Sequence, residues 1–212
     1  MGIAKKYRLY VFDLDGTLAD TRDDLKTAFS KALAYGGYDA LSDEEVVGAI
    51  GRGAAAAMKK LTGLGDEELE PYLNIFREVY EKVCCDNVRL YPGAAQLLRR
   101  LKDEGALLAL VTMKLRVSTE KIIKHLGIDV FDEVVAYEDS EKRKPDPESF
   151  NVMLEKYGVS PGEALMVGDS LTDIRYAKAA GADCCIMAHG YAQAGEIRAE
   201  GPRYLLESFE DF

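Results

Sequence analysis

The chain has 212 residues, enough for one large domain or two small ones, and its 48% hydrophobic and 30% charged residues are typical of a folded globular protein. Its formal net charge of −10 argues against nucleic acid or an anionic membrane as a partner, because both require clustered Lys and Arg. No segment has the apolar length of a signal peptide or a membrane span, so we expect a cytoplasmic protein.

The first predicted strand, residues 9–12, is followed by a region that contains helical patterns only. Asp23–Asp24 fits the first turn of its first helix, where acidic side chains complement the helix dipole. Apolar residues recur there at four-residue spacing, a stripe that can close a helical bundle: Leu25, Phe29 and Leu33, then Phe76 and Tyr80. We therefore expect a helical domain, residues 21–88, inserted into a core made of residues 1–20 and 89–212.

The rest of the chain alternates between strand and helix patterns. Including the first, short apolar runs predict buried strands at residues 9–12, 106–111, 132–137, 164–168 and 184–188. Helical spacing, with proline or glycine at many of the ends, predicts helices at residues 93–105, 147–158 and about 170–180. This alternation predicts an α/β fold: a Rossmann-like parallel sheet with helices on both faces.

Polar residues suited to chemistry follow four of the predicted strands. They are Asp13 and Asp15, Thr112, Lys144, and Asp169 with Asp173. Ligands of a parallel sheet bind outside the carboxyl ends of its strands, so these side chains are predicted to meet at one edge. Their convergence is a stronger signal than any one of them alone.

Two or three carboxylates at one apolar edge repel one another strongly unless a cation neutralises them. Mg²⁺ meets this need, because it takes oxygen ligands, usually from one or two carboxylates, water and substrate phosphate. Asp13 and Asp169 are the predicted ligands, and Asp15 can face the same site or offer its backbone carbonyl. With Lys144 as a cation and Thr112 as a hydroxyl donor, the set fits a phosphoryl group between a metal and a lysine.

Four segments together resemble the motifs of the haloacid dehalogenase (HAD) superfamily: "DLDGT" at 13–17, Thr112, "KPDP" at 144–147 and "GDSLTD" at 168–173. The helical insertion resembles the C1-type cap of that superfamily. Motif order and spacing resemble phosphoglycolate phosphatase-like members over nearly the whole chain. The resemblance implies a phosphoric monoester hydrolase: a Mg²⁺-dependent phosphatase for a small phosphorylated metabolite, with 2-phosphoglycolate as the first candidate.

The same resemblance implies a role for each site residue. Asp13 would be the nucleophile that forms an aspartyl-phosphate, and Asp15 the general acid and then base. Asp13, Asp15 and Asp169 would bind the metal. The phosphoryl group would be bound by Thr112, Met113, Lys144 and the turn at Gly16. Asp173 would orient a metal-bound water or Lys144, a role compatible with charge complementarity in the first turn of a helix.

Two positions bear on the choice of substrate. Many relatives carry Asn or Ser where this chain has Met113. The backbone N–H of Met113 can still bind phosphate, whereas the changed side chain is expected to alter substrate preference. Arg52 lies between two glycines in "AIGRGAAAAM" (49–58), which resembles the substrate-specificity loop of C1 caps. It is a candidate ligand for an anionic substrate group, and a solvated arginine in an interhelix turn stays equally open.

Two other functions can use the same residues. A mutase resembling β-phosphoglucomutase would return the phosphoryl group to a sugar, and a receiver-like signalling module would hold it on an aspartate. The order of the residues and the inserted helices disfavour the receiver. A small phosphate ester is the expected partner, and the choice between monomer and dimer stays open. The cysteines occur as two adjacent pairs, which favours free thiols over a zinc site or a disulfide framework.

Overall fold

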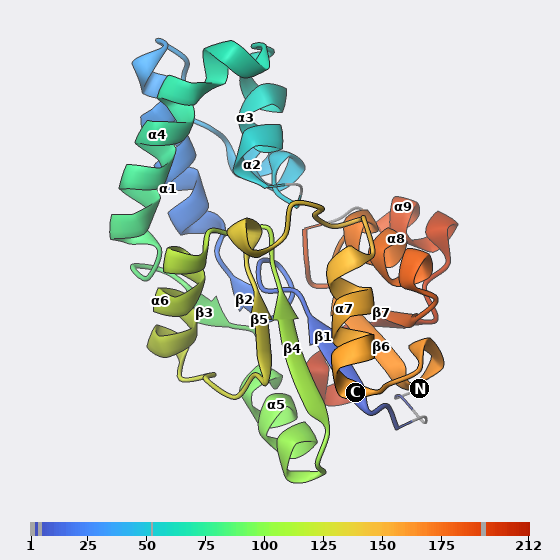
Figure 1. Ribbon diagram of the computed structural model, residues 1–212. Coiled ribbons are helices and arrows are strands. Elements are labelled where there is room, and N and C mark those ends of the chain that lie inside the picture. The colour runs from blue at the N-terminus through green and yellow to red at the C-terminus, as the bar shows by residue number, and fades with distance from the viewer. Residues whose placement is uncertain (1–2, 4–5, 52, 192–193) are drawn as a thin grey trace.

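A computed structural model describes residues 3, 6–51, 53–191 and 194–212 (Figure 1). Its centre is a six-stranded parallel sheet with the strand order β5-β4-β1-β6-β7-β8. The strands are β1 (Leu9–Phe12), β4 (Leu107–Val111), β5 (Glu133–Val135), β6 (Ala164–Gly168), β7 (Asp183–Met187) and β8 (Tyr204–Leu206). The first five lie within two residues of the predicted runs, which confirms the α/β fold. The edge strand β8 was missed, because three residues are too few to display a strand pattern.

Helices cover both faces of the sheet. Along β1, Leu9 and Val11 point into one core, while Tyr10 and Phe12 point into the other. This alternation follows from the two-residue period of a strand. Apolar side chains of α5 (Ala94–Asp103) and α6 (Arg116–Leu126) pack in the core of Tyr10. Those of α7 (Glu148–Tyr157), α8 (Leu171–Ala180) and α9 (Ala194–Glu200) pack in the core of Leu9.

Four helices between the first and second strands of the main sheet lie above the carboxyl ends of those strands (Figure 1). We call them the cap helices: α1 (Arg22–Tyr35), α2 (Asp43–Ala49), α3 (Ala54–Thr62) and α4 (Asp66–Val83). Phe29 of α1 and Phe76 of α4 pack together with ring centroids 4.4 Å apart and an interplanar angle of 30°. The apolar stripe expected from the sequence therefore closes this bundle. Division of the chain into two domains at residues 21 and 88 remains a proposal.

Two short strands connect the cap helices to the core. They are β2 (Ala19–Asp20) and β3 (Arg89–Leu90), which pair antiparallel. Asp24, in the first turn of α1 as expected, is buried and accepts hydrogen bonds from Asn87 N (3.0 Å) and Val88 N (3.1 Å). This carboxylate therefore connects the first turn of α1 to the segment that leads back to the core, a contact that its place in a helical pattern did not reveal.

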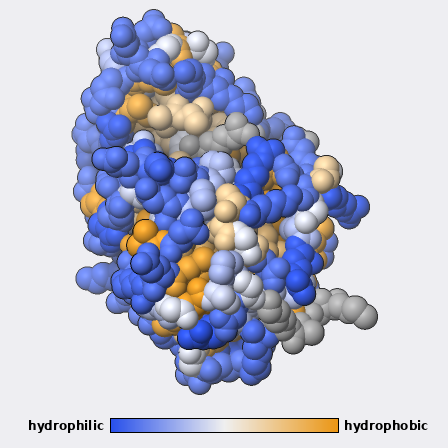
Figure 2. All heavy atoms as spheres, turned by 45° about the vertical axis from the view of Figure 1, so that its right-hand side comes forward, coloured by the Kyte–Doolittle hydropathy of each residue, from blue (hydrophilic) through white to orange (hydrophobic). Residues whose placement is uncertain are grey.

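The molecular surface is mostly hydrophilic in the view of Figure 2, with hydrophobic side chains confined to small patches. Among the described helices, none combines the length and apolar character needed to cross a bilayer. All four cysteines are free thiols, as expected. Short 3₁₀ turns complete the structure: η1 (Tyr137–Asp139), η2 (Pro161–Glu163) and η3 (Phe209–Asp211).

Candidate active site

The main sheet brings the expected side chains to one edge. Asp13 directly follows β1, and its N–H continues the ladder by donating to Val167 O of β6 (2.9 Å). Thr112 follows β4 in the same way, with its N–H donating to Val135 O (2.9 Å). Asp169 follows β6. Because β4, β1 and β6 are adjacent parallel strands, their carboxyl ends place these groups side by side.

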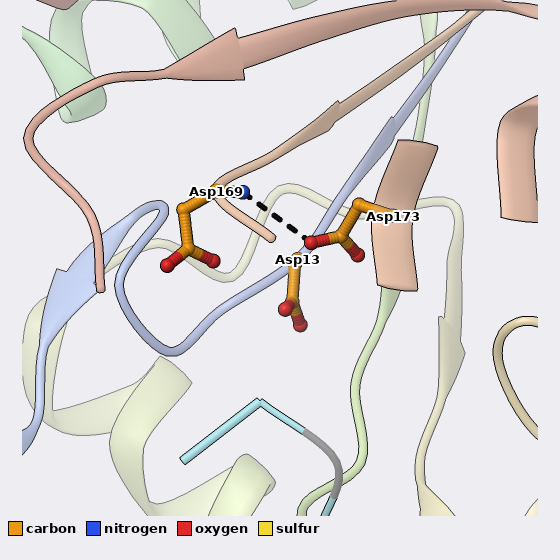
Figure 3. A group of neighbouring side chains, drawn as sticks. All are labelled: Asp13, Asp169 and Asp173. Carbon is orange, nitrogen blue, oxygen red and sulfur yellow. Dashed lines mark hydrogen bonds between the residues drawn. The ribbon is translucent and has the colours of Figure 1, made fainter. Parts of the chain in front are cut away.

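Three carboxylates form a buried cluster at this edge. Asp13 and Asp169 directly follow β1 and β6, and Asp173 belongs to α8. One oxygen of each lies within 4.8 Å of the others (Figure 3). Burial raises the pKa of Asp13 to about 7, with further contributions from Asp173 and Asp15. Burial also raises the pKa of Asp169 well above its ordinary value, followed by repulsion from Asp173 and Asp13. Negative charge is therefore costly here without a cation.

Lys144 supplies one positive charge to the cluster. Its Nζ lies 3.1 Å from Asp13 Oδ1 and 2.8 Å from Asp173 Oδ1, and its side chain is 2% exposed. Burial alone would lower the pKa of Lys144, but attraction to Asp13 and Asp173 outweighs it and raises that pKa above its ordinary value. Lys144 is thus an ammonium. Three carboxylates around one ammonium leave an excess of negative charge.

Asp173 has both oxygens committed to protein donors. Its Oδ2 accepts from Ser170 Oγ (2.7 Å), Ser170 N (3.1 Å) and Asp169 N (3.3 Å), while Oδ1 accepts from Lys144. It therefore caps α8 and also fixes the lysine and the backbone at Asp169. A Cβ at Gly168 would overlap the Asp173 side chain, so this close approach requires glycine.

Asp169 lies between two tight loops. Its Oδ2 accepts from Tyr191 N (2.7 Å), and its Oδ1 accepts from Thr17 Oγ1 (3.2 Å). Gly16 (φ +76°) and Gly190 permit this arrangement, because a Cβ at either would overlap the Asp169 side chain. The Gly16 N–H already donates to Ala19 O (2.9 Å), so the structure supports Gly16 as a turn residue rather than as a phosphate donor. Tyr191 was not predicted, since its contribution is a backbone N–H.

Asp15 lies outside the three-carboxylate cluster. Its Oδ1 accepts from Thr21 Oγ1 (2.6 Å) and lies 3.1 Å from Lys114 Nζ. Lys114 is buried, lies two residues after Thr112, and was not singled out from the sequence. The side chain of Asp15 therefore faces a separate pair of partners, which leaves its backbone carbonyl as the group to offer to a metal.

A cavity of about 90 Å³ lies between the cap helices and the core. Asp13, Asp15 and Thr112 line its core side, and the cap helices contribute mainly apolar groups: Leu25, Phe29, Ala54, Ala57, Leu73 and Phe76. Half-buried Met113 also lines it, and a Cβ at Gly53 would lie 3.4 Å from Met113 Cε. Met113 thus faces the cap loop, on the side expected for substrate. Arg52, the candidate substrate ligand in that loop, lies outside the described residues.

The carboxylate cluster has the chemistry of a divalent-cation site. Asp13 Oδ2 accepts no hydrogen bond from the residues that the structure describes. The backbone at Gly16 and Gly190 lies against the Asp169 side chain and holds it close to Asp13. Hard oxygen donors with excess negative charge are what Mg²⁺ and similar ions require. The residues present therefore fit such an ion.

Comparison with known proteins agrees with this geometry. Residues 10–187 match the family model described as haloacid dehalogenase-like hydrolase. The chain is 32% identical to phosphoglycolate phosphatase 1 of Pseudomonas aeruginosa, covering 96% of this chain and 78% of that protein. It is 34% identical to the phosphoglycolate phosphatase of Vibrio cholerae, covering 96% and 94%.

Solved structures extend the likeness to the whole fold. A protein described as a predicted phosphoglycolate phosphatase from Haemophilus somnus superposes with a TM-score of 0.90 and 30% identity, covering 98% of this chain and 97% of that one. A hydrolase from Pseudomonas syringae gives a TM-score of 0.82 at 26% identity, covering 97% and 95%. The family match, the sequence relatives and the shared fold all agree: this chain belongs to the haloacid dehalogenase-like hydrolases.

Proposed function

We propose that this chain is a Mg²⁺-dependent phosphatase that hydrolyses small phosphate monoesters through an aspartyl-phosphate on Asp13. The observation that carries the proposal is the buried Asp13 carboxylate, which lies beside Lys144 and Asp169 and lines a cavity beneath the cap helices. We take 2-phosphoglycolate as the first candidate substrate, because the relatives quoted above are named for its hydrolysis.

Binding of the phosphoryl group would use residues at the ends of β1 and β4 together with Lys144. The Thr112 hydroxyl can donate to a phosphoryl oxygen, and Met113 N–H has no acceptor among the described residues. Lys144 adds positive charge from the side of Asp13. Mg²⁺ bound by Asp13, Asp169 and the backbone carbonyl of Asp15 would neutralise the carboxylates and the charge on the phosphoryl oxygens.

The first half-reaction transfers the phosphoryl group to the protein. A carboxylate oxygen of Asp13 attacks phosphorus, the ester P–O bond breaks, and its electron pair stays with the leaving oxygen. Asp15 donates the proton that this oxygen needs to leave as an alcohol. Both carboxyl groups line the cavity, so a substrate bound there can reach both.

The second half-reaction regenerates the enzyme. Asp15, now a carboxylate, removes a proton from a water molecule whose oxygen attacks the phosphorus of the aspartyl-phosphate. The bond between phosphorus and the Asp13 oxygen breaks, and inorganic phosphate leaves. Division of one displacement into two lowers the barrier to each step.

The test is a phosphate-release assay with Mg²⁺ on a panel that contains 2-phosphoglycolate, sugar phosphates, nucleotides and pyrophosphate. We expect release from at least one small monoester, with 2-phosphoglycolate among the best. Isomerisation of a sugar phosphate without net release would identify a mutase instead. A phosphorylated protein that does not turn over would identify a receiver-like module.

A further inference from the structure

A second charged cluster lies beside the three carboxylates, and the reaction above leaves part of it without a role. It contains Asp15, Thr21, Lys114 and Tyr80, which come from four separate segments of the chain. Asp15 and Lys114 belong to the core, Thr21 directly precedes α1, and Tyr80 belongs to α4. Three of the four, Asp15, Lys114 and Tyr80, line the cavity.

Lys114 is the centre of this cluster. Its side chain is 4% exposed, and its Nζ lies 3.1 Å from Asp15 Oδ1. The same nitrogen donates a hydrogen bond to Tyr80 OH and lies 4.2 Å from the centroid of the Tyr80 ring. A buried ammonium is costly unless it is paired, so these two contacts determine where Lys114 lies.

Asp15 is held through one oxygen only. Both Thr21 Oγ1 and Lys114 Nζ contact Oδ1, whereas Oδ2 has no hydrogen-bond partner among the described residues. Oδ2 is therefore the oxygen that can exchange a proton with a substrate in the cavity. Because the carboxyl group is planar, the two contacts at Oδ1 also set the direction of Oδ2.

Tyr80 ties this arrangement to the cap helices. Its ring stacks on Phe76 of the same helix, with centroids 5.5 Å apart and an interplanar angle of 6°. Burial, followed by the nearby charge of Asp15, raises the pKa of Tyr80 well above its ordinary value, so its oxygen is a neutral hydroxyl that accepts from Lys114. Displacement of α4 would remove one of the two partners of Lys114.

We propose that Lys114 is a positioning residue that directs the Asp15 carboxyl toward the leaving oxygen, and that Tyr80 makes this orientation depend on α4 lying against the core. The inference rests on the proposed phosphatase reaction and concerns only its proton transfer. Lys114 acts through Asp15 and need not touch the substrate. Misplacement of a proton donor by about 1 Å can reduce a rate by about 10²-fold.

The test compares two esters of nearly the same shape, phenyl phosphate and 4-nitrophenyl phosphate. Phenoxide is the stronger base and needs a proton to leave, whereas 4-nitrophenoxide leaves without one. We expect Lys114→Met to lower kcat/KM about 100-fold for phenyl phosphate and less than about fivefold for 4-nitrophenyl phosphate. Tyr80→Phe, which removes only the hydroxyl, should change the ratio in the same direction by about fivefold.

Lys121→Met is the matched control. Lys121 of α6 also reaches α4, where its Nζ contacts Glu81 O and Glu81 Oε1 at 3.1 Å, one residue beyond Tyr80. It has no contact with Asp15 among the described residues. If loss of a core-to-cap contact were enough, Lys121→Met would change the ester ratio as Tyr80→Phe does. We expect the ratio to stay at its wild-type value.

The outcomes separate this inference from the proposed function. If the wild-type protein releases phosphate from no ester, the proposed function is wrong. A wild-type protein that hydrolyses both esters, with an unchanged ratio in Lys114→Met, removes only the role of Lys114. Circular dichroism reports whether that variant folds. If it does not fold, Tyr80→Phe decides in its place: an unchanged ratio there overturns the inference.

Discussion

The two buried lysines of the site are held by different parts of the molecule. Lys144 contacts Asp13 and Asp173, which both belong to the core. Lys114 contacts Asp15 of the core and Tyr80 of the cap helices. The contacts of Lys144 therefore do not depend on where the cap helices lie, whereas one contact of Lys114 does. In the proposed reaction, phosphoryl transfer would therefore use contacts within the core, and proton transfer would use contacts that the cap helices complete.

The largest effect is expected at Asp13, the proposed nucleophile. Asp13→Asn removes the attacking carboxylate and should lower turnover by about 10⁴-fold or more for every ester. The variant should still fold, because an amide fits the same space. A phosphate-release assay measures the loss of turnover, and thermal unfolding followed by circular dichroism measures whether the variant folds. Near-normal phosphatase activity in a folded variant would exclude Asp13 as the nucleophile.

Metal removal should affect only the cluster of Asp13, Asp169 and Asp173. EDTA should bring phosphate release to background, and excess Mg²⁺ should restore it, because the excess negative charge of the cluster requires a cation. Mg²⁺ at 100 times its Kd should also stabilise the folded protein by about 2.7 kcal/mol. Differential scanning fluorimetry should detect this gain in wild type and in Lys114→Met, but not in Asp169→Asn. Activity that survives EDTA would remove the metal from the proposal.

Lys144→Met sharpens the contrast between the two lysines. It leaves Asp13 and Asp173 buried without their ammonium, so the free energy of unfolding should fall by about 3 kcal/mol. Activity should fall by about 10³-fold. The loss should be equal for phenyl and 4-nitrophenyl phosphate, because the proposed role of Lys144 is to bind the phosphoryl group, which the two esters share. If the two esters respond as differently as in Lys114→Met, the assignment of separate roles is wrong.

The smallest effect is expected at Asp24, where the first cap helix contacts the segment that leads back to the core. In Asp24→Asn, an amide nitrogen would face the Asn87 and Val88 N–H groups that the carboxylate now binds. The free energy of unfolding should fall by about 2 kcal/mol, measured by urea denaturation. Activity on 4-nitrophenyl phosphate should change less than about threefold. A large loss on that ester would mean that the cap helices also govern phosphoryl transfer.

Sequence reasoning brought Asp13, Asp169 and Asp173 to one site, because each directly follows a strand or lies in the first turn of a helix. The position of Asp13, Thr112 or Asp169 depends on local patterns and on a general property of parallel sheets. The second cluster depends on how α4 lies against the core. Tyr80 was assigned to an apolar stripe, which is correct for its ring, but the partner of its hydroxyl is 34 residues away.

Other contacts were missed for related physical reasons. Asp24 was expected to complement a helix dipole, and it lies in that first turn, yet its buried partners are 63 and 64 residues farther along the chain. Tyr191 contributes through its backbone, which no side-chain pattern encodes. Lys114 follows Met113 in a segment whose charge suits an exposed loop equally well. Burial of a single lysine is decided by packing between elements.

The position of Asp169 has a consequence for how the protein assembles. Its side chain is held by Thr17, 152 residues earlier, and by Tyr191, 22 residues later. Contacts of such long sequence separation form late, because the entropy of closing a long loop opposes them. The same long separation is closed when β1 pairs with β6, where Leu9 lies beside Ala164. Under the proposed function, we therefore expect phosphate release to recover only after this central strand pair has formed.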